Sequence, residues 1–293
     1  MPHFITLVLV PGVFLGCIYG LVTIGFNVAE VTARVLNFAQ GSVILWAPLA
    51  ALVAWQHWGW PKWLALLFGV FVSIALNVLA KEIALRPFIG RPVSFQWLLS
   101  GLGVATILNQ IAVKPYGGEQ QAFPLSLSVN SYDVGGIRVA PQQMLLVGAM
   151  VGMFLVLRFL YKRTTIGHML IAVGQDVDGA KAIGIPPQLM ASIAFAISGA
   201  TAAAAGLIAA PYLLVSPNLG FQLLFIGFVA LMFGGITSIG GGLIGGLIVG
   251  VTVQATAVYI GAQWNDVVVF GFLIALYVAR PTGLFGRRAG RIV

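Results

Sequence analysis

The sequence predicts an all-α, polytopic transmembrane helical bundle with eight or nine crossings, and three observations support this. Hydrophobic residues make up 60% of the 293 residues and charged ones only 8%, whereas an ordinary soluble domain carries about 25% charged residues. Residues 182–265 contain no Lys, Arg, Asp, Glu or His. The apolar residues also form long unbroken runs, which indicate helices rather than the alternating strands of a membrane barrel.

Nine apolar segments account for the predicted crossings, since a crossing needs about 20 residues. In chain order they are 5–27, 41–57, 63–85, 94–114, 141–161, 187–212, 221–236, 241–262 and 265–280. The seventh segment is short and runs into a glycine-rich stretch, so it could be a broken or re-entrant element. The expected count is therefore eight or nine.

The distribution of Lys and Arg predicts the orientation, because cytoplasmic loops are rich in both. One alternating set of loops carries most of the cations: Lys81, Arg86, Arg91, Lys162, Arg163, Lys181, Arg280, Arg287, Arg288 and Arg291. The other set carries Lys62, Lys114 and Arg138. We therefore expect the N-terminus outside and the C-terminus in the cytoplasm. The formal net charge of +8 lies in these loops and not in a basic patch with aromatic residues, so we expect no nucleic-acid partner.

Two connections are long, and they differ in character. Residues 115–140 are rich in Pro and Gly, and we expect an irregular extracytoplasmic loop with short strand-like pieces. Residues 162–186 are polar and periodic, and they lie on the cytoplasmic side. Thr164 or Thr165 could cap a short helix there, and Gly184 with Pro186 could end it. We expect no soluble domain, so residues 1–293 form a single transmembrane domain.

The second of these loops carries a candidate docking surface. Gly179 and Ala180 would give its short helix a low ridge of small residues that fits the groove of another protein. Gln175, Asp176 and Gly184 flank the ridge. A solvated loop helix is the alternative, and the residues alone leave it open.

Polar residues recur every three or four positions from Asn27 to Gln40, which predicts that they share one helical face. Polar groups inside a membrane usually face a cavity or the bundle interior. They are therefore candidates for lining a translocation pathway, and the set is Asn27, Glu30, Arg34, Asn37 and Gln40, followed by Ser42. For Glu30 and Arg34 the alternative is an ion pair at the cytoplasmic interface.

Further polar residues in the apolar segments have two interpretations each. Thr106, Asn109 and Gln110 in the fourth segment, and Gln254 in the eighth, could line a pathway or form hydrogen bonds between helices. Asn218 and Gln222 flank a predicted extracytoplasmic turn where a binding protein would dock. Local turn chemistry with Pro217 and Gly220 is the alternative there.

Glycines of the eighth segment predict close helix packing. Gly241 and Gly245 form one pair of small residues at four-residue spacing, and Gly242 and Gly246 form another. A break in the helix that exposes carbonyl groups is the alternative.

The sequence offers no catalytic or metal-binding constellation. His3, His57 and His168 lie far apart and Cys17 is the sole cysteine, so we expect no metal, no cofactor and no disulfide. The glycines near Lys181 lack the Gly-Lys-Ser/Thr of a phosphate-binding loop and follow no strand, which argues against ATP binding.

Six motifs in order resemble the permease subunits of branched-chain amino-acid type ABC importers, over nearly the whole chain. They are Asn37-Phe38-Ala39-Gln40-Gly41; Arg86-Pro87 and Arg91-Pro92 with Gly101-Leu102-Gly103; residues 172–185; Pro217-Asn218-Leu219-Gly220; residues 234–241; and Arg280-Pro281-Thr282-Gly283-Leu284-Phe285-Gly286. After the first three residues of the first motif the family usually shows His, Gly and an acidic residue. Here they are Gln40, Gly41 and Ser42, which leaves the substrate open.

The resemblance implies a transport subunit of the bacterial cytoplasmic (inner) membrane without an ATPase site of its own. Its partners would be a second homologous permease, two cytosolic ATPase subunits and an extracytoplasmic substrate-binding protein. Residues 162–186 would be the cytoplasmic coupling loop, and the substrate would be a branched-chain amino acid or a related small polar solute. A secondary transporter or a channel is the alternative, although the scarcity of acidic residues within the crossings argues against ion coupling.

Overall fold

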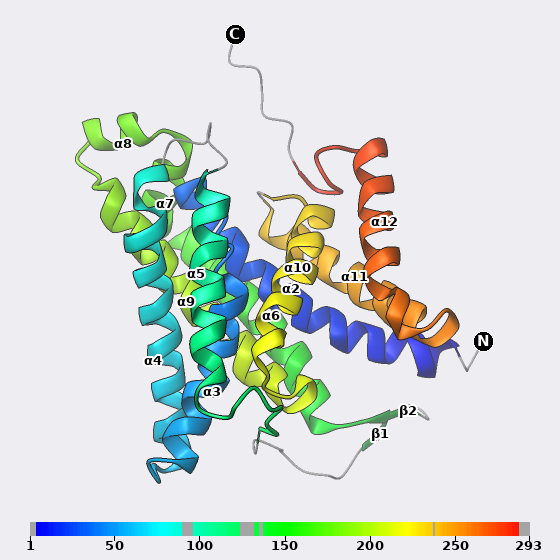
Figure 1. Cartoon of the computed structure of the whole chain (residues 1–293). Helices are drawn as coiled ribbons and strands as arrows, with labels where there is room; N and C mark the ends of the chain where they lie inside the picture. The colour runs from blue at the N-terminus through cyan, green and yellow to red at the C-terminus, as the bar shows by residue number, and fades with distance from the viewer. Residues whose placement is uncertain (1–3, 90–95, 124–131, 135–136, 237, 287–293) are drawn as a thin grey trace.

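The computed structural model describes residues 4–89, 96–123, 132–134, 137–236 and 238–286 (Figure 1). Within these residues, eight helices are long and apolar enough to cross a membrane. Each of the nine predicted segments contains a long helix. These are α2 (Val10–Ala33), α3 (Gln40–Gln56), α4 (Lys62–Ala80), α5 (Gln96–Val113), α6 (Pro141–Arg163), α9 (Pro187–Leu213), α10 (Pro217–Gly234), α11 (Ile239–Tyr259) and α12 (Asn265–Ala279). The all-α transmembrane prediction is confirmed.

The seventh helix is not the short one, since α3 and α12 both have fewer residues than α10. α10 runs without a break over its 18 residues, so a re-entrant seventh element is wrong. α3 has 17 residues, and at 1.5 Å per residue it is about 25 Å long, less than the roughly 30 Å of a hydrocarbon core.

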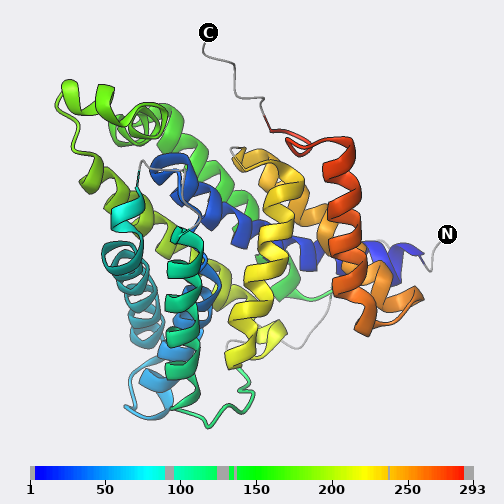
Figure 2. The ribbon, with the colours of Figure 1, turned by 45° about the horizontal axis from the view of Figure 1, so that its top comes forward.

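Helix α2 runs through the middle of the bundle and packs on both α11 and α9 (Figures 1 and 2). α3, α4 and α9 pack on one another to form one side of the molecule, whereas α11 and α12 form the other, with α10 between the two groups. The bundle therefore consists of two groups of helices joined by α2 and α10.

The two ends of the bundle carry different connections (Figure 1). The short helices α7 (Thr165–Gln175) and α8 (Val177–Ala182) lie at the end where α12 finishes. The opposite end carries a hairpin of β1 (Tyr132–Val134) and β2 (Ile137–Val139), which pair antiparallel. Gln121 forms a further bridge with Val215, between α9 and α10.

The last described residues close the end of α10. Leu284 N–H donates to the Phe233 carbonyl at 2.9 Å and Phe285 N–H to the Gly234 carbonyl at 3.2 Å. Gly235, which follows α10, has φ +98°, a conformation that glycine adopts without strain. Two of the six sequence motifs, 234–241 and 280–286, therefore meet in space.

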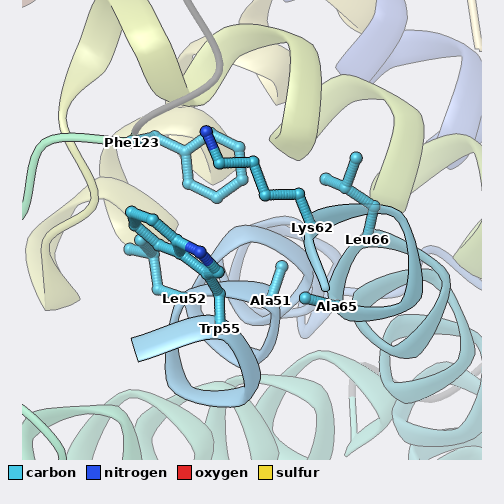
Figure 3. Close-up of a pocket in the computed structure, with 7 residues that line it drawn as sticks. All are labelled: Ala51, Leu52, Trp55, Lys62, Ala65, Leu66 and Phe123. Atoms are coloured by element: carbon cyan, nitrogen blue, oxygen red, sulfur yellow. The ribbon is translucent and has the colours of Figure 1, made fainter. Parts of the chain in front are cut away.

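A small crevice lies between α3 and α4 at the hairpin end (Figure 3). The Lys62 ammonium lies 5.3 Å from the ring centroid of Trp55. The other lining residues are apolar: Ala51, Leu52, Ala65, Leu66 and Phe123. Its volume of about 20 Å³ holds about one water molecule, so it is too small for a transported amino acid.

Candidate functional site

The chain stops being helical at Arg34, within the stretch where the sequence predicts one continuous helical face. Arg34 has φ +57°, in the left-handed region, and its N–H donates to the Glu30 carbonyl. A left-handed residue at this position ends a helix. Residues 35–39 are buried and non-helical, and α3 begins only at Gln40. The predicted shared face is therefore wrong, because Asn27 and Glu30 lie on α2 and the later residues do not.

Hydrogen bonds to three other helices hold this non-helical stretch, termed here the 34–39 segment, and the start of α3. Asn37 Nδ2 donates to Asn77 Oδ1 on α4. Gln40 Nε2 donates to the Ser198 carbonyl on α9 at 3.2 Å, and Ser198 Oγ donates back to Gln40 Oε1 at 3.0 Å. Ser42 Oγ donates to the Ala105 carbonyl on α5 at 3.1 Å. The first turn of α3 is thus fixed by hydrogen bonds inside the protein.

Two glycines bring further sequence motifs to the same place. A Cβ on Gly41 would collide with the Gly220 carbonyl of α10, so only glycine fits there. A Cβ on Gly101 of α5 would lie 3.3 Å from Phe38 Cβ. Irregular backbone at membrane depth is tolerated where protein buries it or where it lines a water-filled path. Residues 34–42 are therefore the strongest pathway candidate.

The polar residues of α5 do not share one environment. Asn109 is 5% exposed and lies beside Gly220, and neither polar atom of its amide has a partner. Thr106 and Gln110 are exposed on the outer face of the same helix. Thr106 Oγ1 donates to the Leu102 carbonyl of its own helix.

Asn218 and Gln222 lie in the first two turns of α10 and are exposed. The predicted turn between them is therefore wrong, because Pro217 begins the helix, as proline commonly does at a first helical position. α10 packs beside α5. Two neighbouring helices thus each expose amide side chains.

The remaining pathway candidates have other contacts. Asn27 is buried and donates to the Thr23 carbonyl at 3.2 Å, while its Oδ1 has no partner. Gln254 donates to the Leu7 carbonyl, near the other end of α2. Arg34 Nε donates to the Gly174 carbonyl of α7. Within the described residues, Arg34 and Glu30 form no ion pair, so that alternative is wrong.

The loop of residues 162–186 forms two short helices, α7 and α8, where the sequence predicts one. Thr164 Oγ1 caps α7 by accepting from Gly167 N–H at 3.1 Å. Asp176 Oδ1 caps α8 by accepting from Asp178 N–H at 3.0 Å. The N-cap residue has an extended backbone conformation, so Asp176 separates the helices. Gly184, at φ +84°, follows the second helix.

Only part of the predicted docking ridge faces outward. Ala180 is 3% exposed and belongs to the apolar cluster that contains Val173 and Met190, so its outward placement is wrong. The other predicted residues are exposed: Gln175, Asp176, Gly179 and Gly184. Sequence reasoning missed Ile183, which is 73% exposed just after α8. An isoleucine within a polar loop is the signal that could have identified it.

A family model described as "Branched-chain amino acid transport system / permease component" matches residues 8–278. The high-affinity branched-chain amino acid permease protein BraD of Pseudomonas aeruginosa is 28% identical, over 95% of each chain. The fructose import permease protein FruF of Bifidobacterium longum is 27% identical, over 76% of this chain and 61% of its own.

In the solved structures, PsaBC from Streptococcus pneumoniae in complex with a Fab matches with a TM-score of 0.47 and 11% identity, over 91% of this chain and 90% of that one. The family match covers nearly all of the bundle, from α2 through α12. The chain belongs to the family of permease components of branched-chain amino acid transport systems.

Proposed function

We propose that the chain is the transmembrane permease subunit of an ATP-binding-cassette importer of the bacterial cytoplasmic membrane. It moves a branched-chain amino acid or a related small polar solute by alternating access, driven by separate ATPase subunits. Family membership supports this proposal, and so do the eight membrane-capable helices. The sequence has no phosphate-binding loop for an ATPase site of its own.

The observation that carries the proposal is the exposed surface of the α7–α8 unit. Its inner side packs on α2 and α9, whereas Gln175, Asp176, Gly179 and Ile183 are exposed. A large apolar side chain exposed beside polar ones, as Ile183 is, is typical of a protein interface. We infer that two ATPase subunits dock on this surface and on its counterpart in a second permease, and that it faces the cytoplasm.

A second, homologous permease would cover the amide-bearing face of α5 and α10. Gln110 and Gln222 are exposed in the single chain, and polar side chains at membrane depth usually face protein or water, not lipid. A translocation path between two permeases would be lined by this face and by the first turn of α3. At the extracytoplasmic end, Asn218 would lie where a substrate-binding protein docks.

The substrate class rests on the relatives and on the neutral first turn of α3. BraD is named for branched-chain amino acids and FruF for fructose. Gln40 and Ser42 are uncharged, and both donate to backbone carbonyls. A neutral polar lining suits a zwitterionic or uncharged solute better than a strongly charged one.

A secondary transporter or a channel is the competing function, and Glu30 favours it. This carboxylate is half-buried in α2, and its Oε2 has no partner. Buried carboxylates are common in ion-coupled transporters. Glu30 lies only one turn from the end of α2, however, and the other pathway candidates are neutral apart from Arg34.

The first test is a pull-down of the tagged protein in mild detergent, followed by mass spectrometry. We expect two ATPase subunits and a second permease to be recovered with it. Ile183→Asp should reduce ATPase recovery at least tenfold. Ile260→Asp is the matched control, because Ile260 is 58% exposed and follows the C-terminal end of α11, outside the α7–α8 unit. A homo-oligomer without any ATPase would instead support the channel or secondary transporter.

A further inference from the structure

A row of buried polar side chains follows one face of α4 into the π-helical turn η2 (Lys81–Leu85). Ser73, Asn77 and Lys81 occupy it at four-residue spacing, and each is 0% exposed. Each donates to a carbonyl of α9: Ser73 to Gly199 at 3.0 Å, Asn77 to Phe195 at 2.8 Å, and Lys81 to Gln188 at 3.3 Å. These three residues with their acceptors are termed here the α4–α9 ladder.

The last rung is an ammonium group removed from solvent. Lys81 Nζ lies 2.6 Å from Glu82 Oε1 and 2.9 Å from Ser192 Oγ, in addition to the Gln188 carbonyl. Burying a charge costs several kcal/mol unless partners satisfy it, and here three oxygens do so. The α-helix changes to a π-helix at this residue, and π-helical turns are frequent at functional sites.

The other two rungs of the ladder contact the candidate pathway element and the start of α3. Asn77 Oδ1 accepts from Asn37 Nδ2 of the 34–39 segment. Ser73 Oγ also lies 3.3 Å from the Val43 carbonyl in the first turn of α3. The α4 side chains therefore contact α9 and the start of α3 at once.

The charged end lies next to the α7–α8 unit. Gln188 is in the first turn of α9, only a few residues after α8, and it borders a groove that is also lined by Val177 and Asp178 of α8. A displacement of α8 would therefore move α9 at Gln188, whose carbonyl accepts a hydrogen bond from Lys81. Arg34 adds a second connection, since it joins the 34–39 segment to Gly174 at the end of α7.

Close packing of α4 on α9 does not require a buried charge. A Cβ on Gly199 would lie 2.8 Å from Ile74 Cα, so this glycine alone already lets the two helices touch. The ion pair between the buried Lys81 and the part-exposed Glu82 contributes little net adhesion compared with apolar groups of similar volume. What it adds is a fixed register between two helices, and this is what transmission of a movement requires.

We propose that the α4–α9 ladder, with Lys81 as its positioning residue, transmits movement of the α7–α8 unit to the 34–39 segment. Lys81 does not contact the solute or ATP. It keeps α4 and α9 in one register, so that both helices and the start of α3 move together when the coupling surface moves. This inference rests on the proposed function.

The test uses the complex recovered in the pull-down, with Cys17→Ser and Ser42→Cys as the shared background. Labelling of the new cysteine by a maleimide reports access to the first turn of α3, and it needs no knowledge of the substrate. We expect the labelling rate to change with ATP and vanadate. Lys81→Met should reduce that change about tenfold while ATP hydrolysis and subunit recovery persist. Lys81→Arg should keep most of it.

Three outcomes would overturn the inference: nucleotide-dependent labelling that survives in Lys81→Met, its absence in the background protein, or loss of ATPase subunits from Lys81→Met. If Lys81→Met does not fold, Ser192→Ala with Glu82→Gln replaces it, because this pair removes the Ser192 hydroxyl and the negative charge of Glu82 and keeps the lysine. A background complex that contains no ATPase contradicts the proposed function itself, which separates the two failures.

Discussion

Two helix pairs in the bundle pack closely by different means. In the α2–α11 interface the contacts are made by backbone: a Cβ on Gly16 would lie 2.7 Å from Leu247 Cα, and one on Gly12 2.8 Å from Val251 Cα. Cβ atoms on Gly246 and Gly250 would collide with the backbone of α2. In the α4–α9 interface a glycine contact is joined by three side-chain hydrogen bonds, two of them buried and the third part-buried.

Both kinds of helix packing are expected in a lipid environment. Lipid is as apolar as a leucine side chain, so helices in a membrane associate through close van der Waals contact and hydrogen bonds. The glycine interface supplies contact but no directional bond. The ladder supplies directional bonds that specify which turn of α4 meets which turn of α9. The first interface should therefore be sensitive to volume, and the second to polarity.

The largest loss of stability is expected when a larger side chain replaces a glycine of the α2–α11 interface. Gly246→Leu would drive a side chain into the backbone of Gly20. Overpacking costs about 1–3 kcal/mol where neighbours can shift, and backbone atoms on a facing helix cannot shift far. We expect loss of most of the monodisperse protein in fluorescence-detected size-exclusion chromatography.

Gly148→Leu is the control for that substitution. Nothing lies within 4 Å of a Cβ at Gly148, on α6, so this variant should match the wild type. If Gly246→Leu and Gly148→Leu give the same amount of monodisperse protein, close packing at α2–α11 is not what stabilises that side of the bundle.

An intermediate loss of stability is expected when a polar side chain of the α4–α9 ladder is replaced by an apolar one. Asn77→Leu keeps the branching of the side chain but leaves Asn37 Nδ2 and the Phe195 carbonyl without this partner. An unsatisfied buried polar group costs about 1–3 kcal/mol. We expect a lower midpoint in thermal unfolding followed by chromatography.

A double-mutant cycle with Asn37→Ala separates this bond from the rest. Because the two amides bond each other, the second substitution should cost less once the first is present. Strictly additive effects would show that the Asn37–Asn77 bond contributes nothing to stability.

The sequence predicts this fold well because lipid imposes a simple rule. Long apolar runs must be helices, and all nine runs are. The close packing around Gly241, Gly242, Gly245 and Gly246 also follows from spacing alone, and the alternative of a broken helix there is wrong. These features depend on residues near one another in the chain.

The site is less predictable because it depends on single conformations and distant partners. The sequence reads as one polar face from Asn27 to Gln40, but the left-handed Arg34 divides it, and left-handed conformation is uncommon in a residue with a side chain. Lys81 counts as a loop cation in the sequence, whereas three oxygens from Glu82, Ser192 and Gln188 hold it in the interior. Two of those oxygens come from a helix more than a hundred residues away.

The smallest effect is expected at the first rung of the ladder. Ser73→Ala removes one hydroxyl that lies within bonding distance of the Gly199 and Val43 carbonyls. Both carbonyls lie within helices, so little is left unpaired, and side-chain hydrogen bonds in membranes average about 0.6 kcal/mol. We therefore expect a shift in the thermal midpoint well below that of Asn77→Leu, measured in the same chromatographic assay. A loss as large as that of Asn77→Leu would mean that the ladder acts as one cooperative network rather than as separate rungs, and the register would then depend on all three residues equally.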